Sequence, residues 1–167
     1  ANIFGSAFCM ATNRDRTFPT ESQIDAEINR YLSYRRDHRR WTEISFFGGN
    51  FLGLADSQIV QLLAVADKYI QAGRAQGIRF STRPDTINDK RVTLIRGYPI
   101  STIEIGAQSM NASVLNVSRR GHSPEETIKA LTLLKNNGFR TGLQMMVGLP
   151  EESEQEALAS AQQMAGL

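Results

Sequence analysis

Glycines and polar side chains follow each of several short apolar runs, and this arrangement is the part of the chain best suited to chemistry. The run Ile44–Phe47 stops at Gly48-Gly49-Asn50. Later runs end in Ser81 to Arg83, in Glu104 through Ser109, and in Gln144 through Gly148. Paired glycines allow positive φ and let a ligand approach the backbone closely. These run ends are therefore the candidate binding positions.

Each run end also has a purely structural interpretation. The glycine pair could be an ordinary strand-to-helix turn. An unpaired polar group in a buried strand costs about 1–3 kcal/mol, so Glu104 and Gln144 need partners. Glu104 could pair with a core arginine such as Arg83 without any ligand. The residues alone leave the structural and the binding interpretation of Glu104 open.

Several other kinds of site are excluded or disfavoured. There is no G-x-x-x-x-G-K-S/T motif, and the segment 48–53 does not fit the dinucleotide pattern G-x-G-x-x-G. His38 and His122 are too far apart in sequence to suggest a zinc pair. The single cysteine, Cys9, excludes an internal disulfide framework and suits a reducing compartment. A lone cysteine is more often a small buried hydrophobe than a catalytic thiol.

The bulk composition is that of an ordinary globular domain. The chain has 167 residues, 41% hydrophobic and 22% charged, which suits one domain with a sizeable core. A net charge of +2 demands neither a nucleic-acid nor a membrane partner. The arginine cluster at 35, 36, 39 and 40 is better explained as a solvated helix end than as an RNA contact. No apolar run approaches the roughly 20 residues of a membrane span, and no secretory signal is visible. We expect a cytoplasmic protein.

Strand and helix patterns alternate along the chain. Strands are predicted at 43–47, 78–82, 101–106 and 141–147, with a short strand or its exit loop within 1–10. Helices are predicted from Thr20 to an end within 34–40, from Asp56 to Gly73, at 88–95, weakly at 110–117, from Ser123 to Gly138, and from Ser153 to Leu167. This alternation favours an α/β fold with a parallel sheet. A complete eight-unit barrel needs about 250 residues, so we expect an open sheet or part of a barrel. The carboxyl ends of parallel strands lie at one edge of the sheet, so the polar residues and glycines that follow the apolar runs should lie together at that edge.

Five segments in a fixed order resemble the radical S-adenosylmethionine (SAM) enzymes. They are Phe46-Phe-Gly-Gly-Asn50, Phe80-Ser-Thr-Arg-Pro-Asp85, Thr102-Ile-Glu-Ile-Gly-Ala-Gln-Ser109, Ser118-Arg-Arg-Gly-His122 and Leu143-Gln-Met-Met-Val-Gly-Leu-Pro150. The similarity covers roughly residues 20–160 and is greatest to the branch shared by the elongator catalytic subunit and oxygen-independent coproporphyrinogen oxidase. It implies a partial (β/α)6 TIM-like barrel with parallel strands and outer helices. Residues 1–167 would form a single core domain that stops after the fifth βα unit.

The resemblance also implies a SAM site across the carboxyl ends of the strands. The residues implied to bind SAM are Gly48, Gly49, Asn50, Ser81, Arg83, Gln108, Arg120, Gln144 and Val147. In this scheme the Gly-Gly-Asn turn meets the methionyl amino group through backbone atoms. Gln108 and Arg120 contact the carboxylate and ribose, Gln144 faces the ligand, and Val147 with Gly148 lies near the adenine.

The family also holds a [4Fe–4S] cluster, on three cysteines spaced C-x3-C-x2-C, because soft thiolates suit iron–sulfur clusters. The resemblance implies Cys9 as one ligand, and this spacing then places Asn2 and Ser6 at the other two positions. The implied chemistry is one-electron cleavage of SAM to methionine and a 5′-deoxyadenosyl radical.

Two alternative functions stay open. The first is a cluster-less SAM- or nucleotide-binding module on the same scaffold. The second is a non-redox βα enzyme that binds a small anionic substrate through Arg83, Glu104 and Gln144. The sequence names no substrate and no oligomeric state, and RNA is kept as a possible substrate on the arginine cluster alone.

Overall fold

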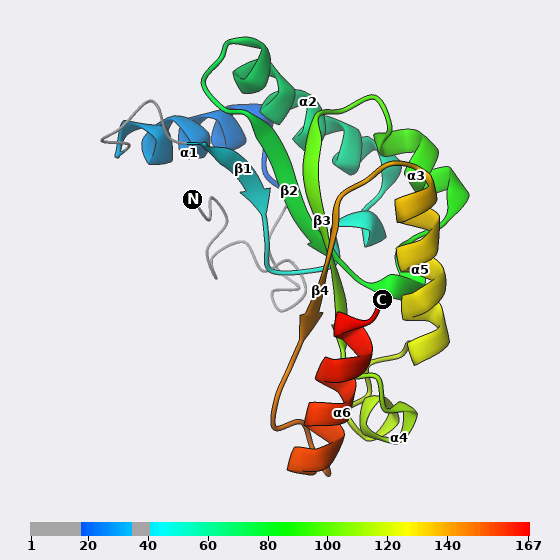
Figure 1. Cartoon of the computed structure of the whole chain (residues 1–167). Helices are drawn as coiled ribbons and strands as arrows, with labels where there is room; N and C mark the ends of the chain where they lie inside the picture. The colour runs from blue at the N-terminus through cyan, green and yellow to red at the C-terminus, as the bar shows by residue number, and fades with distance from the viewer. Residues whose placement is uncertain (1–17, 35–40) are drawn as a thin grey trace.

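A parallel sheet of four strands forms the centre of the computed structural model, which describes residues 18–34 and 41–167 (Figure 1). The strands lie in the order β1-β2-β3-β4, and every neighbouring pair is parallel. They are β1 (Glu43–Phe46), β2 (Gly77–Thr82), β3 (Ile100–Gln108) and β4 (Thr141–Met145). The predicted parallel α/β sheet is confirmed. The predicted strand or loop within 1–10 and the arginine cluster at 35–40 lie outside the described residues.

Helices connect the strands, as a parallel sheet requires. They are α1 (Glu21–Ser33), α2 (Asp56–Gln71), α3 (Asp89–Ile95), α4 (Ala112–Val117), α5 (Pro124–Asn136) and α6 (Glu154–Ala165), with two short 3₁₀ turns, η2 (Phe51–Gly53) and η3 (Pro84–Thr86). Within the described ranges, no helix is long and apolar enough to cross a membrane.

The two faces of the sheet differ in chemistry. The apolar face aligns Ile44 with Ile78 and Phe46 with Phe80 and Ile103, and these residues join the core formed with α2, α3 and α5. Phe51 of η2 stacks on Phe80 with ring centroids 4.4 Å apart. Burial of this face supplies the main driving force for folding.

The opposite face of the sheet is polar. Side chains alternate along a strand. One row across this face pairs Ser45 with Arg79 and Arg79 with Thr102, and the next pairs Ser81 with Glu104 and Glu104 with Gly142. In a barrel this face would line the interior.

The helix ends follow the predicted local signals. Thr20, Ser123 and Ser153 each form a capping box at the start of a helix. Gly73 and Gly138 follow the C-cap residues of α2 and α5, with φ values of 70° and 78°. After both glycines the backbone forms the paired hydrogen bonds of a Schellman motif, and this left-handed turn favours glycine.

A buried tyrosine joins α1 to α2. Tyr69 is only 5% exposed, and its hydroxyl donates to Asp25 Oδ1 at 2.5 Å. The same hydroxyl accepts from Asn29 Nδ2 at 2.6 Å. Burial, followed by the hydrogen bond to Asp25, raises the pKa of Tyr69 to about 12.

This pKa predicts a loss of stability at high pH. An unfolded tyrosine has a pKa of about 10, so the stabilisation is fully present below about pH 10 and is lost as the pH rises towards 12. Tyr69→Phe should lower the free energy of unfolding by about 1 kcal/mol near neutral pH, and it should remove this alkaline loss. Urea unfolding of both proteins between pH 7 and 11.5 measures the effect. Parallel pH profiles for the two proteins would contradict it.

Candidate ligand site at the carboxyl edge of the sheet

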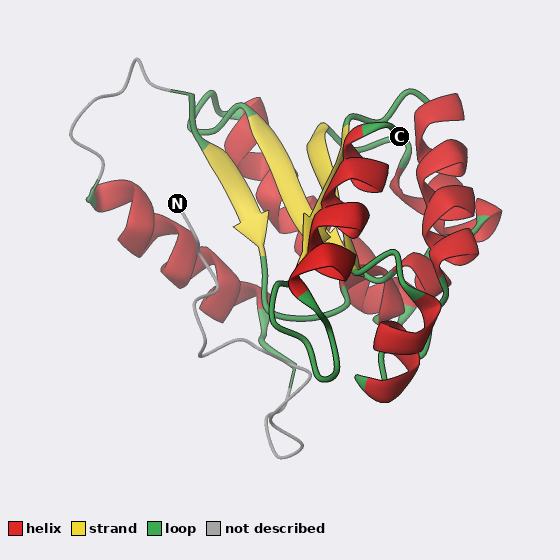
Figure 2. Ribbon diagram, turned by 60° about the horizontal axis from the view of Figure 1, so that its bottom comes forward, coloured by secondary structure: helices red, strands yellow, loops and turns green. Residues whose placement is uncertain are grey.

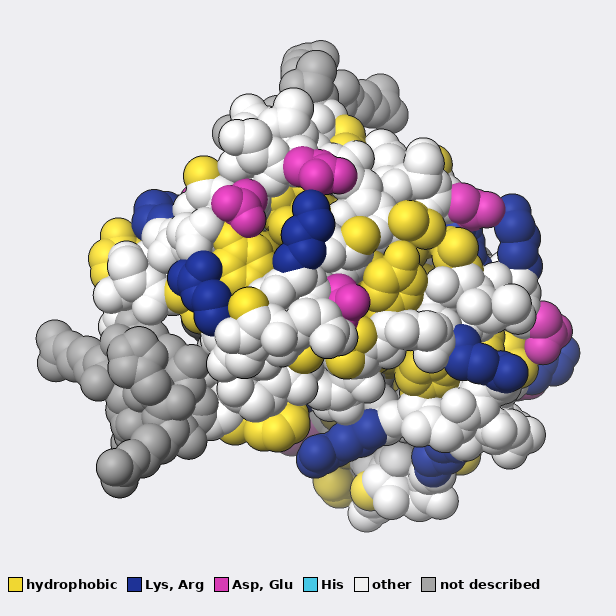
Figure 3. All heavy atoms as spheres, turned by 90° about the horizontal axis from the view of Figure 1, so that it is seen from above, with side chains coloured by type: hydrophobic (Ala, Val, Ile, Leu, Met, Phe, Trp, Pro, Cys, Tyr) yellow, Lys and Arg dark blue, Asp and Glu magenta, His cyan; other side chains and the backbone are white. Residues whose placement is uncertain are grey.

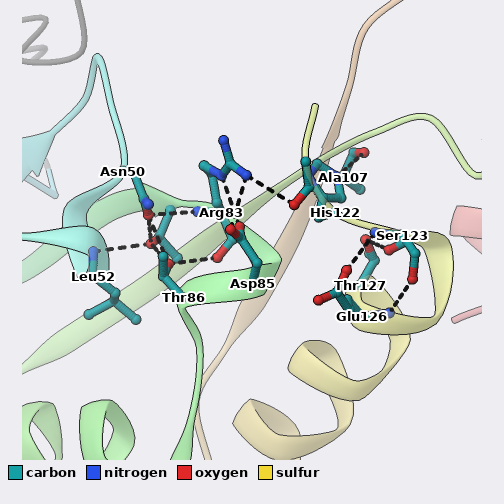
Figure 4. Close-up of polar contacts among 12 residues, drawn as sticks. Asn50, Leu52, Arg83, Asp85, Thr86, Ala107, His122, Ser123, Glu126 and Thr127 are labelled. Carbon is teal, nitrogen blue, oxygen red and sulfur yellow. Dashed lines mark hydrogen bonds and ion pairs between the residues drawn. The ribbon is translucent and has the colours of Figure 1, made fainter. Parts of the chain in front are cut away.

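The carboxyl ends of the strands meet at one edge, which Figure 2 brings forward. Three contacts connect the loops there. Asn50 bonds to the end of β2, Arg83 bonds to Gly121, and His122 bonds to Ala107 (Figure 4). The edge thus gathers the glycine turn (Gly48–Asn50), the start of η3, and the loop between α4 and α5. Figure 3 shows the opposite end of the molecule, over the amino-terminal edge, where acidic, basic and hydrophobic side chains are interspersed.

The glycine turn leaves backbone groups open. Gly48 has φ 99°, a conformation that favours glycine, and Gly49 is exposed. Within the described part of the chain, neither glycine takes part in a turn hydrogen bond or a hydrogen bond to a side chain. Their polar backbone groups can therefore serve a ligand.

Asn50 directs its side-chain carbonyl into the protein. Oδ1 accepts from the Thr82 and Thr86 hydroxyls, both at 2.8 Å, and from the Arg83 N–H at 3.1 Å. The Leu52 N–H in turn donates to Thr82 Oγ1 at 3.1 Å. Asn50, predicted to bind SAM, lies at this edge of the sheet, and its side-chain carbonyl is occupied by donors of the protein itself. Thr82 and Thr86 were missed; a threonine ending the apolar run of β2 was the available signal.

Arg83 is compensated inside the protein. Its Nε and Nη2 bond to the two carboxylate oxygens of Asp85 at 2.8 and 3.0 Å, and Nη2 also donates to Gly121 O at 3.3 Å. Gly121 has φ 70°, and a Cβ there would lie 3.0 Å from Nη2. Arg83 therefore connects η3 to the next loop, and Asp85 is a site residue that the sequence analysis did not single out.

The predicted pairing of Glu104 with Arg83 is wrong. Glu104 Oε1 instead lies 3.2 Å from Arg79 Nε, and Arg79 Nη1 lies 3.6 Å from Glu43 Oε2. The three side chains come from adjacent strands and share the polar face of the sheet, whereas Arg83 lies beyond the end of β2. The structural interpretation of Glu104 is thus supported, with a different partner.

Gln108, the last residue of β3, is strained and buried. It has φ 67°, is 5% exposed, and follows an irregularity in the pairing of β3 with β4. Its side chain folds over Gly106, where a Cβ would lie 2.7 Å from Gln108 Nε2. Oε1 is buried without a hydrogen-bond partner in the described residues. Backbone strain together with an unpaired buried acceptor is typical of a ligand site.

Arg120 carries the uncompensated charge of the site. It is half-buried, and its Nε is buried without a partner among the described residues. Burial lowers the pKa of Arg120 from its ordinary value, and the charge of Arg83 lowers it further. Both influences disfavour a free guanidinium and favour a bound anion.

His122 lies beside this charge and was not predicted as a site residue. It is 8% exposed, and Nε2 lies 3.0 Å from Ala107 O. A carbonyl only accepts, so Nε2 carries the proton and Nδ1 of the neutral ring is an acceptor. Nδ1 is buried without a partner in the part of the chain that the structure describes. The Arg-Gly-His turn was the signal that could have identified it.

The remaining predicted residues lie further along the same edge. Ser81 is half-buried on the polar face and pairs in register with Glu104. Gln144 is exposed on β4. Val147 is 76% exposed in a bend after β4, which ends at Met145 and not at 147 as predicted. No hydrogen bond or ion pair within the described ranges connects Gln144 or Val147 to Arg120.

Cys9, the predicted cluster ligand, lies outside the described residues. Within those residues, no group of three His, Cys, Asp or Glu side chains could hold a metal ion. The whole chain has one cysteine. One thiolate does not match the three expected for a cluster, so the donor set does not fit and we assign no step to a cluster in this chain.

Comparison with known proteins assigns the family. The model of the Radical SAM superfamily matches residues 4–164. The chain belongs to the radical SAM superfamily. This membership confirms the resemblance drawn from the five segments, and with it SAM and a [4Fe–4S] cluster as the cofactors of the family.

The similar proteins come from the expected branch. A tRNA uridine(34) acetyltransferase of Methanocaldococcus infernus is 35% identical over 80 residues, which cover 48% of this chain and 15% of the relative. The oxygen-independent coproporphyrinogen-III oxidase-like protein HemZ of Bacillus subtilis is 33% identical over 75 residues, covering 44% and 15%. The chain thus matches about one seventh of the length of these relatives.

A solved structure supports the fold. The archaeal Methanocaldococcus infernus Elp3 with an N-terminal deletion has a TM-score of 0.63 at 23% identity, covering 86% of this chain and 37% of that one. The (β/α) architecture, with parallel strands and outer helices, is therefore that of radical SAM domains.

Because the backbone of Gln108 is strained, replacing this residue with glycine should not destabilise the protein. Gln108→Gly relieves the left-handed backbone and removes the unpaired buried acceptor, so the free energy of unfolding should stay equal or rise by about 1 kcal/mol. Arg119, with φ 50° on the surface, is the matched control. Arg119→Gly should relieve similar strain without touching the site. Urea unfolding measures both variants, and a loss of more than about 2 kcal/mol in Gln108→Gly would contradict the interpretation.

Proposed function

We propose that this chain is the SAM-binding part of a radical SAM enzyme, with residues 1–167 forming one core domain. Arg120 receives the carboxylate of SAM. The observation that carries the proposal is that Arg120 has a buried, unpartnered Nε within the described residues, whereas its neighbour Arg83 is paired with Asp85.

The charge balance supports an anionic ligand group. The guanidinium of Arg83 lies close enough to lower the pKa of Arg120. The carboxylate of Asp85 forms its ion pair with Arg83. A buried charge without a partner is costly. A ligand carboxylate would form charge-assisted hydrogen bonds with Arg120 and offset that cost.

The other groups suit the rest of SAM. The backbone of half-buried Gly48 and exposed Gly49 supplies carbonyls for the methionyl ammonium. Gln108 Oε1 and His122 Nδ1 are buried acceptors that match ribose hydroxyls. Val147 offers exposed apolar surface to the adenine, and Ser81 and Gln144 line the same edge. The role of the chain is to bind SAM, orient it and exclude water.

In this superfamily the cluster supplies the electron that cleaves SAM. Because Cys9 is the one cysteine of the chain, the cluster-less SAM-binding module remains the second candidate. The non-redox alternative loses support, because Arg83 and Glu104 are already ion-paired with Asp85 and Arg79.

The proposal also includes a substrate class and a cellular location. The similarity to tRNA uridine(34) acetyltransferases favours tRNA among RNA substrates. A cytoplasmic location is favoured by the single cysteine.

Arg120 and its neighbour Arg119 provide a matched test of SAM binding. Arg120→Ala should weaken SAM binding by about a hundredfold or more, because it removes the partner of the carboxylate. Arg119→Ala removes an exposed arginine one residue away and should leave affinity within about threefold. Isothermal titration calorimetry measures both against the unaltered chain.

The same titration with decarboxylated SAM identifies the group that Arg120 binds. The unaltered chain should bind this analogue about as weakly as Arg120→Ala binds SAM, and Arg120→Ala should not discriminate between the two ligands. Equal affinity of the unaltered chain for both ligands would remove the carboxylate assignment. Absence of SAM binding would overturn the proposed function.

The cluster is tested by anaerobic reconstitution with iron and sulfide. A [4Fe–4S] signal in electron paramagnetic resonance and 5′-deoxyadenosine as a product would support radical chemistry, and Cys9→Ala should then lose both. We expect SAM binding to the Arg120 site to persist without reconstitution, because no residue of that site is a thiolate. Binding with no more than adventitious iron would leave the cluster-less module as the function of this chain.

A further inference from the structure

We propose that Asn50 is a positioning residue that fixes the glycine turn from the protein side and does not contact SAM through its carbonyl. The proposal rests on SAM binding at the glycine turn and assigns a specific device to that site. The contact implied for this turn is through its backbone atoms, and the proposal adds that the Asn50 side chain serves an interior network that includes Thr82 and Thr86.

The hydrogen bonds determine how the amide is oriented. The Arg83 backbone N–H can only donate, so the atom 3.1 Å away must be the Asn50 oxygen. The hydroxyls of Thr82 and Thr86 reach the same oxygen at 2.8 Å each. The Arg83 N–H and the Thr82 hydroxyl already fill the two lone pairs of the carbonyl, and the Thr86 hydroxyl, which can also donate to Arg83 O at 2.9 Å, lies against the same oxygen. This leaves no acceptor capacity for a ligand ammonium.

The donors belong to a different part of the chain. Thr82 ends β2 and is buried, while Arg83 and Thr86 begin and end the η3 turn. Asn50 ends the glycine turn, which follows β1. The network therefore joins two neighbouring strand ends through one side-chain oxygen. The Leu52 N–H also donates to Thr82 Oγ1, so a second hydrogen bond fixes the backbone just after Asn50 to the end of β2.

Gly53 provides the room for this arrangement. A Cβ at residue 53 would lie 2.4 Å from Asn50 Nδ2 and 2.8 Å from Cγ. The amide must therefore rest against the backbone of η2, and any side chain at 53 would displace it. This explains the glycine at an exposed position whose φ is not in the left-handed region.

The consequence for binding is geometric. Gly48 and Gly49 make no turn or side-chain hydrogen bonds of their own within the described residues, so their position depends on the network at Asn50. Loss of the network should loosen the turn and weaken SAM binding by about tenfold to a hundredfold, because misplacement of binding groups by about 1 Å has effects of this size.

A set of four variants separates positioning from direct contact. Asn50→Ala and the double variant Thr82→Val with Thr86→Val should weaken SAM binding to a similar extent in calorimetry. The triple variant should be no weaker than either, because all three changes remove the same network. Asn50→Asp keeps the oxygen that serves the three donors and should retain most of the affinity. Additive losses, or an Asn50→Asp as weak as Asn50→Ala, would show direct contact by the amide and overturn the proposal.

Gly53→Ala breaks the network without deleting a donor or an acceptor. It should weaken SAM binding as Asn50→Ala does. Gly97→Ala is the matched control, since a Cβ there meets nothing within 4 Å and its φ is not left-handed. An affinity for Gly53→Ala equal to that of Gly97→Ala would contradict the clash at Asn50.

Hydrogen–deuterium exchange provides a readout that needs no ligand. The amides of Leu52 and Arg83, which donate to Thr82 Oγ1 and Asn50 Oδ1, should exchange at least about tenfold faster in Asn50→Ala and Gly53→Ala than in the unaltered chain and in Gly97→Ala. If the unaltered chain does not bind SAM but exchange responds as expected, the proposed function fails and the network stands. If SAM binds and exchange is unchanged, the network fails and the proposed function stands.

Discussion

Four strands that all run in one direction impose the main constraint on this molecule. Parallel pairing places every carboxyl end at the same edge, so loops distant in sequence must share one small volume. Hydrophobic burial on the other face holds the strands in this register, through residues such as Phe80 and Ile103. The ligand site therefore depends on the packing of the apolar face of the sheet. Any change that shifts the register of β2 or β3 would move the site as well.

Within that edge, the placement of charges selects the functional residue. Arg79 lies between Glu104 and Glu43 on the polar face, and Arg83 is bound bidentately by Asp85. These carboxylates balance the two charges within the protein, although Arg79 Nε makes an ion pair with Glu104 and no hydrogen bond to any described residue. Arg120 lies beside Arg83 with a buried Nε that no described residue accepts from. The site is thus specified by the arginine left without a partner, more than by the number of arginines nearby.

The same edge also stores unfavourable free energy. Gln108 has a left-handed backbone and a buried, unpaired Oε1, and His122 has a buried, unpaired Nδ1. A scaffold selected for stability alone would avoid both. Asn50 shows the opposite arrangement, since its carbonyl is fully used by Thr82, Thr86 and Arg83. Gln108 and His122 thus present unpaired acceptors to a ligand, whereas the hydrogen bonds of Asn50 hold the neighbouring loops in position.

The sequence by itself determined the elements and the family. Capping boxes such as Thr20 with Gln23 and terminal glycines such as Gly73 act over a few residues, so local spacing predicts them well. The order of five short segments was enough for the superfamily, which spans residues 4–164. Only the tertiary structure decided that Glu104 pairs with Arg79 and that the Asn50 carbonyl faces inward. Those partners lie 25 to 36 residues apart in sequence, and the register between strands, which no local pattern encodes, brings them within hydrogen-bonding distance.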